Sequence, residues 1–158
     1  MDLTKLSRGD TVIGVSGLVL FVVSFFDWLG VTITGGATFN GRSIGGVSLN
    51  LGSANAWHFT LTILAVLLGL VMLVYVVMKA LGVDMPDSFG TVTLGQVMLG
   101  IAVVAFLFVL IKLIAGPNIG FTGAATVSKS RKFGIYVGLA ATVGLMIGAF
   151  LNLQESTA

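Results

Sequence analysis

The chain has no cysteine, two prolines and one histidine, and charged residues occupy only 9% of its 158 positions. Without cysteine it can form no disulfide, no thiolate metal site and no thiol nucleophile. Six acidic residues and one histidine also leave little material for acid–base catalysis. The sequence contains no phosphate-binding or dinucleotide-binding glycine motif and no H-E-x-x-H or G-x-S-x-G motif. We therefore expect no enzyme, no cofactor and no metal.

The low content of charged residues is matched by a high content of apolar residues. They make up 56% of the chain, and the mean hydropathy is +1.09. A soluble domain carries about 25% charged residues, so this composition is typical of a protein embedded in a bilayer. The basic excess shows no aromatic-interleaved stripe, which argues against nucleic acid as a partner.

Four long apolar runs lie at about 10–29, 57–78, 92–114 and 133–151. Each is near the roughly 20 residues that cross a bilayer as a helix. A membrane β-barrel would need many alternating segments of about ten residues instead. The first run exceeds a signal-peptide core of about 7–15 residues and has no A-x-A-like cleavage site. The sequence predicts an all-α fold, a single four-helix transmembrane bundle over residues 1–158.

The connections between these runs differ in composition. The first, Gly30–Ala56, is rich in Gly, Thr, Ser and Asn and has short apolar alternations around Ile33 and Leu49. It is either a short β-hairpin that caps the bundle or an irregular polar loop. The third begins with a helix stop at Gly116 and ends in basic residues that either bind anionic lipid or form a solvated charge run.

Antiparallel threading brings one end of every helix to the same membrane face. These ends carry a candidate polar cluster of Asp27, His58, Lys112, Arg131 and Lys132. We expect His58 to form interfacial hydrogen bonds, and Lys112 to extend toward the lipid headgroups. The same end carries Trp28, Trp57 and Tyr136, which predict an aromatic belt at the headgroup level.

Asp27 is the most unusual member of this set, because carboxylates in transmembrane segments are rare and usually paired. On a helical period it shares a face with Gly14, Gly17 and Ser24. We expect it to point inward and to form an ion pair that fixes helix register. A proton- or ion-handling site and exposure to headgroup water are the alternatives.

Small residues recur at spacings that let helix backbones approach closely. The candidate packing positions are Gly14, Gly17, Ala65, Gly69, Gly134, Gly138, Gly144 and Gly148. They either pack the helices of one chain together or mediate contact between copies.

Parts of the chain resemble an uncharacterised family of small four-helix integral membrane proteins of actinobacteria. The resemblance rests on VVSFFDWLG, on NAWHF before the second run, and on RKFGIYVGLAATVGLMIGAFL. Asp27 precedes the tryptophan where that family has proline. The resemblance implies an architecture and a bacterial source, and it carries over no functional residues.

These observations predict a multi-pass protein of the bacterial plasma membrane. We expect cytoplasmic termini because the basic flank of the first helix is N-terminal, although the total Lys and Arg count favours the reverse. The expected role is a structural or accessory subunit that binds itself or a larger cell-envelope complex. The alternative is a homo-oligomeric channel or transporter with a polar path near Asp27 and His58. The expected partners are the lipid bilayer and either further copies of the chain or other membrane subunits.

Overall fold

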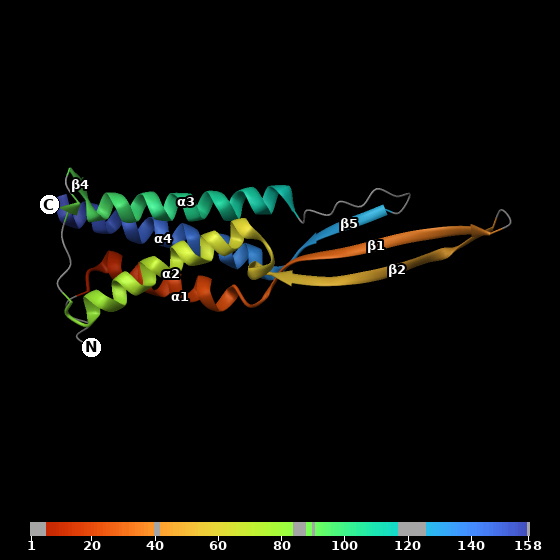
Figure 1. Ribbon diagram of the computed structural model, residues 1–158, viewed down its shortest axis with the longest axis horizontal. Coiled ribbons are helices and arrows are strands. Elements are labelled where there is room, and N and C mark those ends of the chain that lie inside the picture. Colours follow the sequence, from red (N-terminus) through yellow and green to blue (C-terminus); the bar gives the residue numbers. More distant parts are fainter. Residues whose placement is uncertain (1–5, 40–41, 84–87, 90, 117–125, 158) are drawn as a thin grey trace.

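The computed structural model describes residues 6–39, 42–83, 88–89, 91–116 and 126–157. Four helices run side by side, and a three-stranded sheet projects from one end of them (Figure 1). Helix α1 begins and helix α4 ends at the opposite end. The molecule is therefore elongated, with a helical half and a sheet half.

Helix α1 spans Arg8–Val23 and is shorter than the apolar run that predicts it. Ser7 caps its start, accepting a hydrogen bond from the Asp10 backbone, while the Asp10 carboxylate accepts one from the Ser7 backbone. The predicted end at residue 29 is wrong, because the chain turns after Val23 and enters strand β1 at Asp27. Hydropathy alone cannot separate a helix from a buried strand start.

The other helices lie close to their predicted ranges. A short 3₁₀ turn, η2 (Ala56–His58), leads into α2 (Thr60–Ala80). Helix α3 (Leu94–Ala115) starts with a capping box of Thr93 and Gln96. It ends at Gly116, whose φ of +68° suits glycine. Helix α4 spans Phe133–Thr157, beyond the predicted end at 151.

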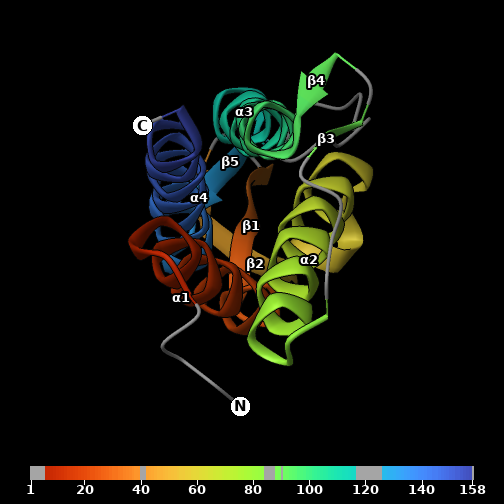
Figure 2. The same ribbon diagram turned by 90° about the vertical axis from the view of Figure 1, so that its left-hand side faces the viewer.

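Three helices, α2, α3 and α4, are long and apolar enough to cross a membrane. Helix α1 has 16 residues, which rise about 24 Å, less than a bilayer core of roughly 30 Å. The four helices form a ring in which α1 and α3 each pack on both α2 and α4 (Figure 2). Side chains such as Ile13, Leu20, Met72 and Leu145 fill its centre and are fully buried.

The sheet contains the hairpin that was one of the two alternatives for the first connection. Strands β1 (Asp27–Phe39) and β2 (Arg42–Asn55) pair antiparallel, and both are longer than predicted. A third strand, β5 (Thr126–Arg131), pairs with the other edge of β1 and was not predicted. The strand order is β2-β1-β5. Strands β3 (Ser88–Phe89) and β4 (Val92–Thr93) form a separate small ladder.

The register sorts residue types into rows across the sheet. Thr32 stands opposite Asn50 on β2 and Ser128 on β5. The next row aligns Ile33, Leu49 and Val127. At these two positions the register sets a polar row beside an apolar row.

Candidate functional site

The junction between bundle and sheet contains all five residues of the predicted polar cluster. Asp27 is exposed at the start of β1, and its Cα pairs with that of Asn55. The expectation that Asp27 points inward from a helix is wrong, because α1 ends at Val23 and its helical period does not reach residue 27. The carboxylate is exposed at the base of the hairpin.

His58 also lies beside Asn55 at this junction. Its Nδ1 is 2.9 Å from Asn55 Oδ1, and the same oxygen accepts a hydrogen bond from the Trp57 backbone at 3.2 Å. Asn55 thereby caps the turn η2. The His58 side chain is exposed. It is thus tied to the entry of α2 by a local hydrogen bond.

Lys112 is only 4% exposed, although it lies in the last turn of α3. Its Nζ stands 4.0 Å from the centroid of the Phe59 ring. A cation over an aromatic face is stabilised by the ring quadrupole, more so where water is excluded. The expectation that Lys112 extends to the headgroups is wrong, because the side chain is buried against Phe59.

Arg131 and Lys132 join β5 to the helices. Arg131 donates from Nε to the Leu113 carbonyl at 2.8 Å, and the Lys132 backbone donates to the Trp28 carbonyl at 2.9 Å. No hydrogen bond or ion pair joins any two of the five residues predicted as a cluster, all of which the structure describes. They share one end of the bundle but do not form a network.

An open groove of about 470 Å³ lies at this junction. It is lined by Phe25, Phe26, Asp27, Lys132, Phe133 and Gly134. The rings of Phe25, Phe26 and Phe133 are 57%, 56% and 73% exposed. The groove therefore combines one carboxylate and one ammonium with an unusually exposed aromatic surface.

The predicted aromatic belt is wrong at Trp28. Its side chain is fully buried, and its Nε1 donates to the Val23 carbonyl at 2.9 Å. The turn after α1 folds the ring inward, and a continuous apolar sequence does not reveal that turn. Trp57 is half-buried and donates to Ser24 Oγ at 3.1 Å, while Tyr136 is exposed. The exposed phenylalanines of the groove were not predicted as site residues, and one of them, Phe133, lies three residues before Tyr136 on α4.

The small residues singled out in the sequence lie at contacts within the chain. A methyl group added at Gly17 would lie 3.1 Å from Leu73 Cβ, and one at Gly14 would lie 3.3 Å from Val76 Cγ1. One at Gly69 would come within 2.6 Å of a Leu20 methyl group. These positions bring α1 and α2 together. Ala65, on the same helix as Gly69, is fully buried.

The glycines of α4 lie against α1 and against Trp28. A methyl group at Gly148 would lie 2.8 Å from Ile13 and one at Gly144 would meet Ser16. At Gly134 and Gly138 the added carbon would come within 2.6 Å of the Trp28 ring. Small residues of α4 thus provide the space that the tryptophan occupies.

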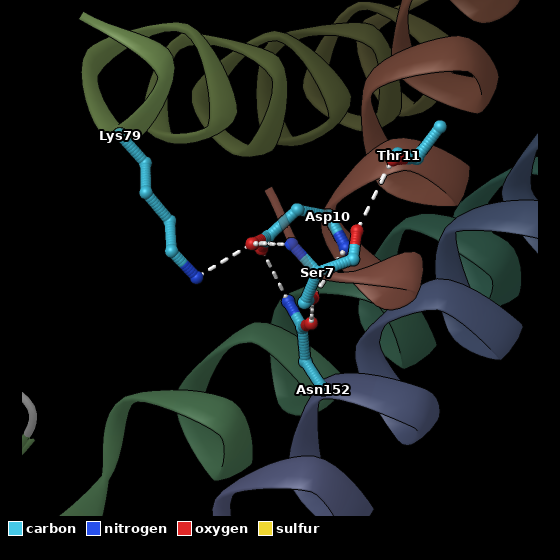
Figure 3. Close-up of polar contacts among 5 residues, drawn as sticks. All are labelled: Ser7, Asp10, Thr11, Lys79 and Asn152. Atoms are coloured by element: carbon cyan, nitrogen blue, oxygen red, sulfur yellow. Dashed lines mark hydrogen bonds and ion pairs between the residues drawn. The ribbon is translucent and has the colours of Figure 1, made fainter. Parts of the chain in front are cut away.

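A second polar site lies at the other end of the bundle, and the sequence analysis missed it (Figure 3). Asp10 is fully buried, and its Oδ2 forms an ion pair with Lys79 Nζ at 2.5 Å. Its Oδ1 accepts a hydrogen bond from Asn152 Nδ2 at 2.7 Å. Ser7 Oγ donates to Asn152 Oδ1 at 2.5 Å. The Ser7-x-x-Asp10 spacing ahead of an apolar run was an available signal for the cap.

Two buried threonines inside the bundle donate to nearby backbone carbonyls. Thr62 donates to the Ala56 and Phe59 carbonyls, and Thr142 donates to that of Leu139. Among the described residues, no buried side-chain nitrogen or oxygen lacks a partner. Nor do the described residues include a group of three or more His, Cys, Asp or Glu side chains that could hold a metal.

The chain therefore combines a helical bundle of membrane-protein character with a projecting sheet and an aromatic, charged groove between them. No known protein-family model matches it, and no curated protein matches it either.

Proposed function

We propose that this chain is a four-helix transmembrane protein of the bacterial plasma membrane. On α4, the apolar stretch from Phe133 to Leu151 rises about 29 Å, and on α2 the stretch from Thr60 to Met78 rises about 29 Å as well. Both match a hydrocarbon core of roughly 30 Å. Asp10 lies in the first turn of the short α1, and its ionic contact with Lys79 supports a boundary at the same level.

The proposed role is a structural or accessory subunit that presents its sheet to a partner in the cell envelope, either another copy or a larger complex. The observation that carries this proposal is the sheet itself, which extends well beyond the bundle (Figure 1). Strand β1 has 13 residues and reaches about 43 Å. A long sheet adds nothing to anchoring in lipid, so its length favours a contact function.

The edges of the sheet support the same role. Within the described chain, no further strand pairs with the outer edge of β2 or of β5. Unpaired strand edges offer backbone donors and acceptors to another strand. Beyond Thr34, β1 pairs only with β2, so the distal part of the hairpin is two-stranded.

A shortened hairpin tests this role directly. Thr34 and Ser48 are paired, so replacing residues 35–47 by Asn-Gly closes the hairpin with a two-residue turn and keeps the three-stranded base. We expect the full chain to co-purify from native membranes with a stoichiometric partner or as an oligomer, and the shortened chain to be monomeric. Equal helix content by circular dichroism is the control.

Two results would count against this role. Isolation of the full chain as a lone monomer in lipid nanodiscs would contradict an accessory subunit, and an unchanged complex after shortening would remove the sheet from the contact. Ion flux in liposomes that is abolished by Asp27→Asn and His58→Ala would instead favour the channel alternative.

A further inference from the structure

We propose that the groove of Phe25, Phe26, Asp27, Lys132, Phe133 and Gly134 binds the headgroup of phosphatidylethanolamine. In the bound state, the lipid phosphate contacts the Lys132 ammonium, and the lipid ammonium donates to the Asp27 carboxylate. This inference rests on the proposed membrane placement of the bundle, and it adds a defined lipid ligand to it.

The size and shape of the groove suit such a ligand. Its volume of about 470 Å³ lies within the roughly 300–1,000 Å³ of small-molecule sites. The groove is open on one side, and three exposed phenylalanine rings line it. A headgroup can therefore enter while its acyl chains stay in the bilayer beside the rings.

The two charges of the groove are not neutralised by the protein. The Asp27 and Lys132 side chains form no hydrogen bond or ion pair with each other or with any other residue of the described chain. Lys132 is held in place through its backbone, which donates to the Trp28 carbonyl next to Asp27. The Lys132 side chain packs over Gly30, where an added methyl group would lie 2.8 Å from Lys132 Cε.

This pair of charges favours a zwitterion over an anion. A purely anionic headgroup would satisfy Lys132 but would be repelled by the Asp27 carboxylate, which lines the same groove. Phosphatidylethanolamine carries both matching charges, and its ammonium has N–H groups that can donate to a carboxylate. Phosphatidylcholine has the same charges but no N–H donor.

The groove also lies at the level where headgroups lie. Phe133 begins the apolar stretch of α4, and Lys132 precedes it at the end of the sheet. The three exposed phenylalanine rings at this level suit contact with the acyl chains, because burying apolar surface away from water is favourable. The charged lining thus faces the headgroups, and the aromatic lining faces the first carbons of the chains.

The test measures lipid binding to the full chain in detergent by native mass spectrometry. Phosphatidylethanolamine, phosphatidylglycerol and phosphatidylcholine with identical acyl chains are titrated separately. We expect the ethanolamine lipid to bind tightest, and Asp27→Asn and Lys132→Gln each to weaken it roughly tenfold or more, because each removes one charge-assisted contact. Lys132→Arg keeps the charge and is expected to retain binding.

Matched controls lie outside the groove. Lys129→Gln removes a charge from strand β5, which directly precedes Lys132, and Glu155→Gln removes an exposed carboxylate at the other end of the bundle, so neither should change the affinity. Equal binding of phosphatidylglycerol that is insensitive to Asp27→Asn would overturn the proposal in favour of a general basic surface. Equal binding of phosphatidylcholine would overturn the ammonium–carboxylate contact, and absence of bound lipid would overturn the site.

The shortened hairpin separates this proposal from the proposed function. It lacks residues 35–47 and retains every residue of the groove. If both proposals hold, it loses its partner and keeps phosphatidylethanolamine. A partner without selective lipid binding would overturn only the groove, and selective lipid binding without a partner would overturn only the accessory role.

Discussion

Trp28 joins the start of the sheet to the helical bundle. Its ring fills the space above Gly134 and Gly138 on α4, and its indole N–H reaches back to the Val23 carbonyl at the end of α1. A single buried side chain therefore fixes the direction in which the chain leaves α1. The neighbouring phenylalanines, which lack this space, stay exposed.

We expect Trp28→Ala to destabilise the fold by about 3–5 kcal/mol, because it leaves a large cavity between β1 and α4. The matched control is Trp57→Ala, which removes a half-buried ring and is expected to cost less than half as much. Thermal unfolding in detergent, followed by circular dichroism, measures both. Equal losses would contradict the central position of Trp28.

Asp10 is the corresponding residue at the opposite end. One carboxylate there caps α1 and contacts α2 through Lys79 and α4 through Asn152 (Figure 3). Because Asp10 is fully buried, each of these contacts replaces water that the carboxylate would otherwise bind.

We expect Asp10→Ala to lower stability by about 2–3 kcal/mol, since it leaves Asn152 without its acceptor and Lys79 without its anion. A double-mutant cycle of Asp10→Ala with Lys79→Gln is expected to give a coupling of about 0.5–3 kcal/mol. Glu155→Gln, at an exposed carboxylate of α4, should leave stability unchanged. Additive effects of the two changes would show that the ion pair contributes nothing.

Strand β5 is the element that converts a hairpin into a sheet. It pairs the segment before α4 with β1, and so connects the second half of the chain to the first by backbone hydrogen bonds. Its sequence, TVSKSR, has one apolar residue and a basic end. Local composition of this kind is typical of a loop, and only pairing with β1 makes it a strand.

A disulfide test can verify the register of β5, and the cysteine-free chain offers a clean background. Val31 and Lys129 are direct partners across β1 and β5. We expect Val31→Cys with Lys129→Cys to form a disulfide on mild oxidation. Val31→Cys with Ser130→Cys should not, because neighbouring residues of a strand point to opposite faces. Efficient formation by the second pair would contradict the register.

The molecule as a whole has two unlike ends. At one end α1 begins, α4 ends and Asp10 makes its contacts, and at the other end lie the groove and the sheet (Figure 1). Basic residues occur at both, so charge counting alone gives no decisive orientation. The cytoplasmic termini predicted from the basic flank of the first helix would set the sheet outside the cell.

Cysteine labelling tests this placement. Lys129→Cys lies at the sheet end and Glu155→Cys at the end of α4, and both positions are exposed. We expect a membrane-impermeant maleimide to label the first in intact cells and the second only after permeabilisation. The opposite pattern would reverse the orientation, and equal labelling of both in intact cells would contradict a membrane-spanning bundle.

The sequence by itself determined the four helical segments and their order. Runs of about 20 apolar residues leave the backbone few ways to satisfy its hydrogen bonds other than a helix. It also indicated the hairpin through the alternation around Ile33 and Leu49. Small residues such as Gly17 and Gly148 indicated where backbones approach, and the structure places Gly17 of α1 against α2 and Gly148 of α4 against α1.

Only the tertiary structure decided where charge and aromatic surface lie. The sequence predicted Asp27 in a helix and Trp28 in an aromatic belt, whereas the structure places Asp27 in β1 and Trp28 in the core. The reason is that the chain turns after Val23, and the hydropathy does not change across that turn. Asp10, Lys79 and Asn152 come from three different helices, and no local pattern relates them. A residue's hydrophobicity is a property of its type, but its neighbours depend on how distant segments pack.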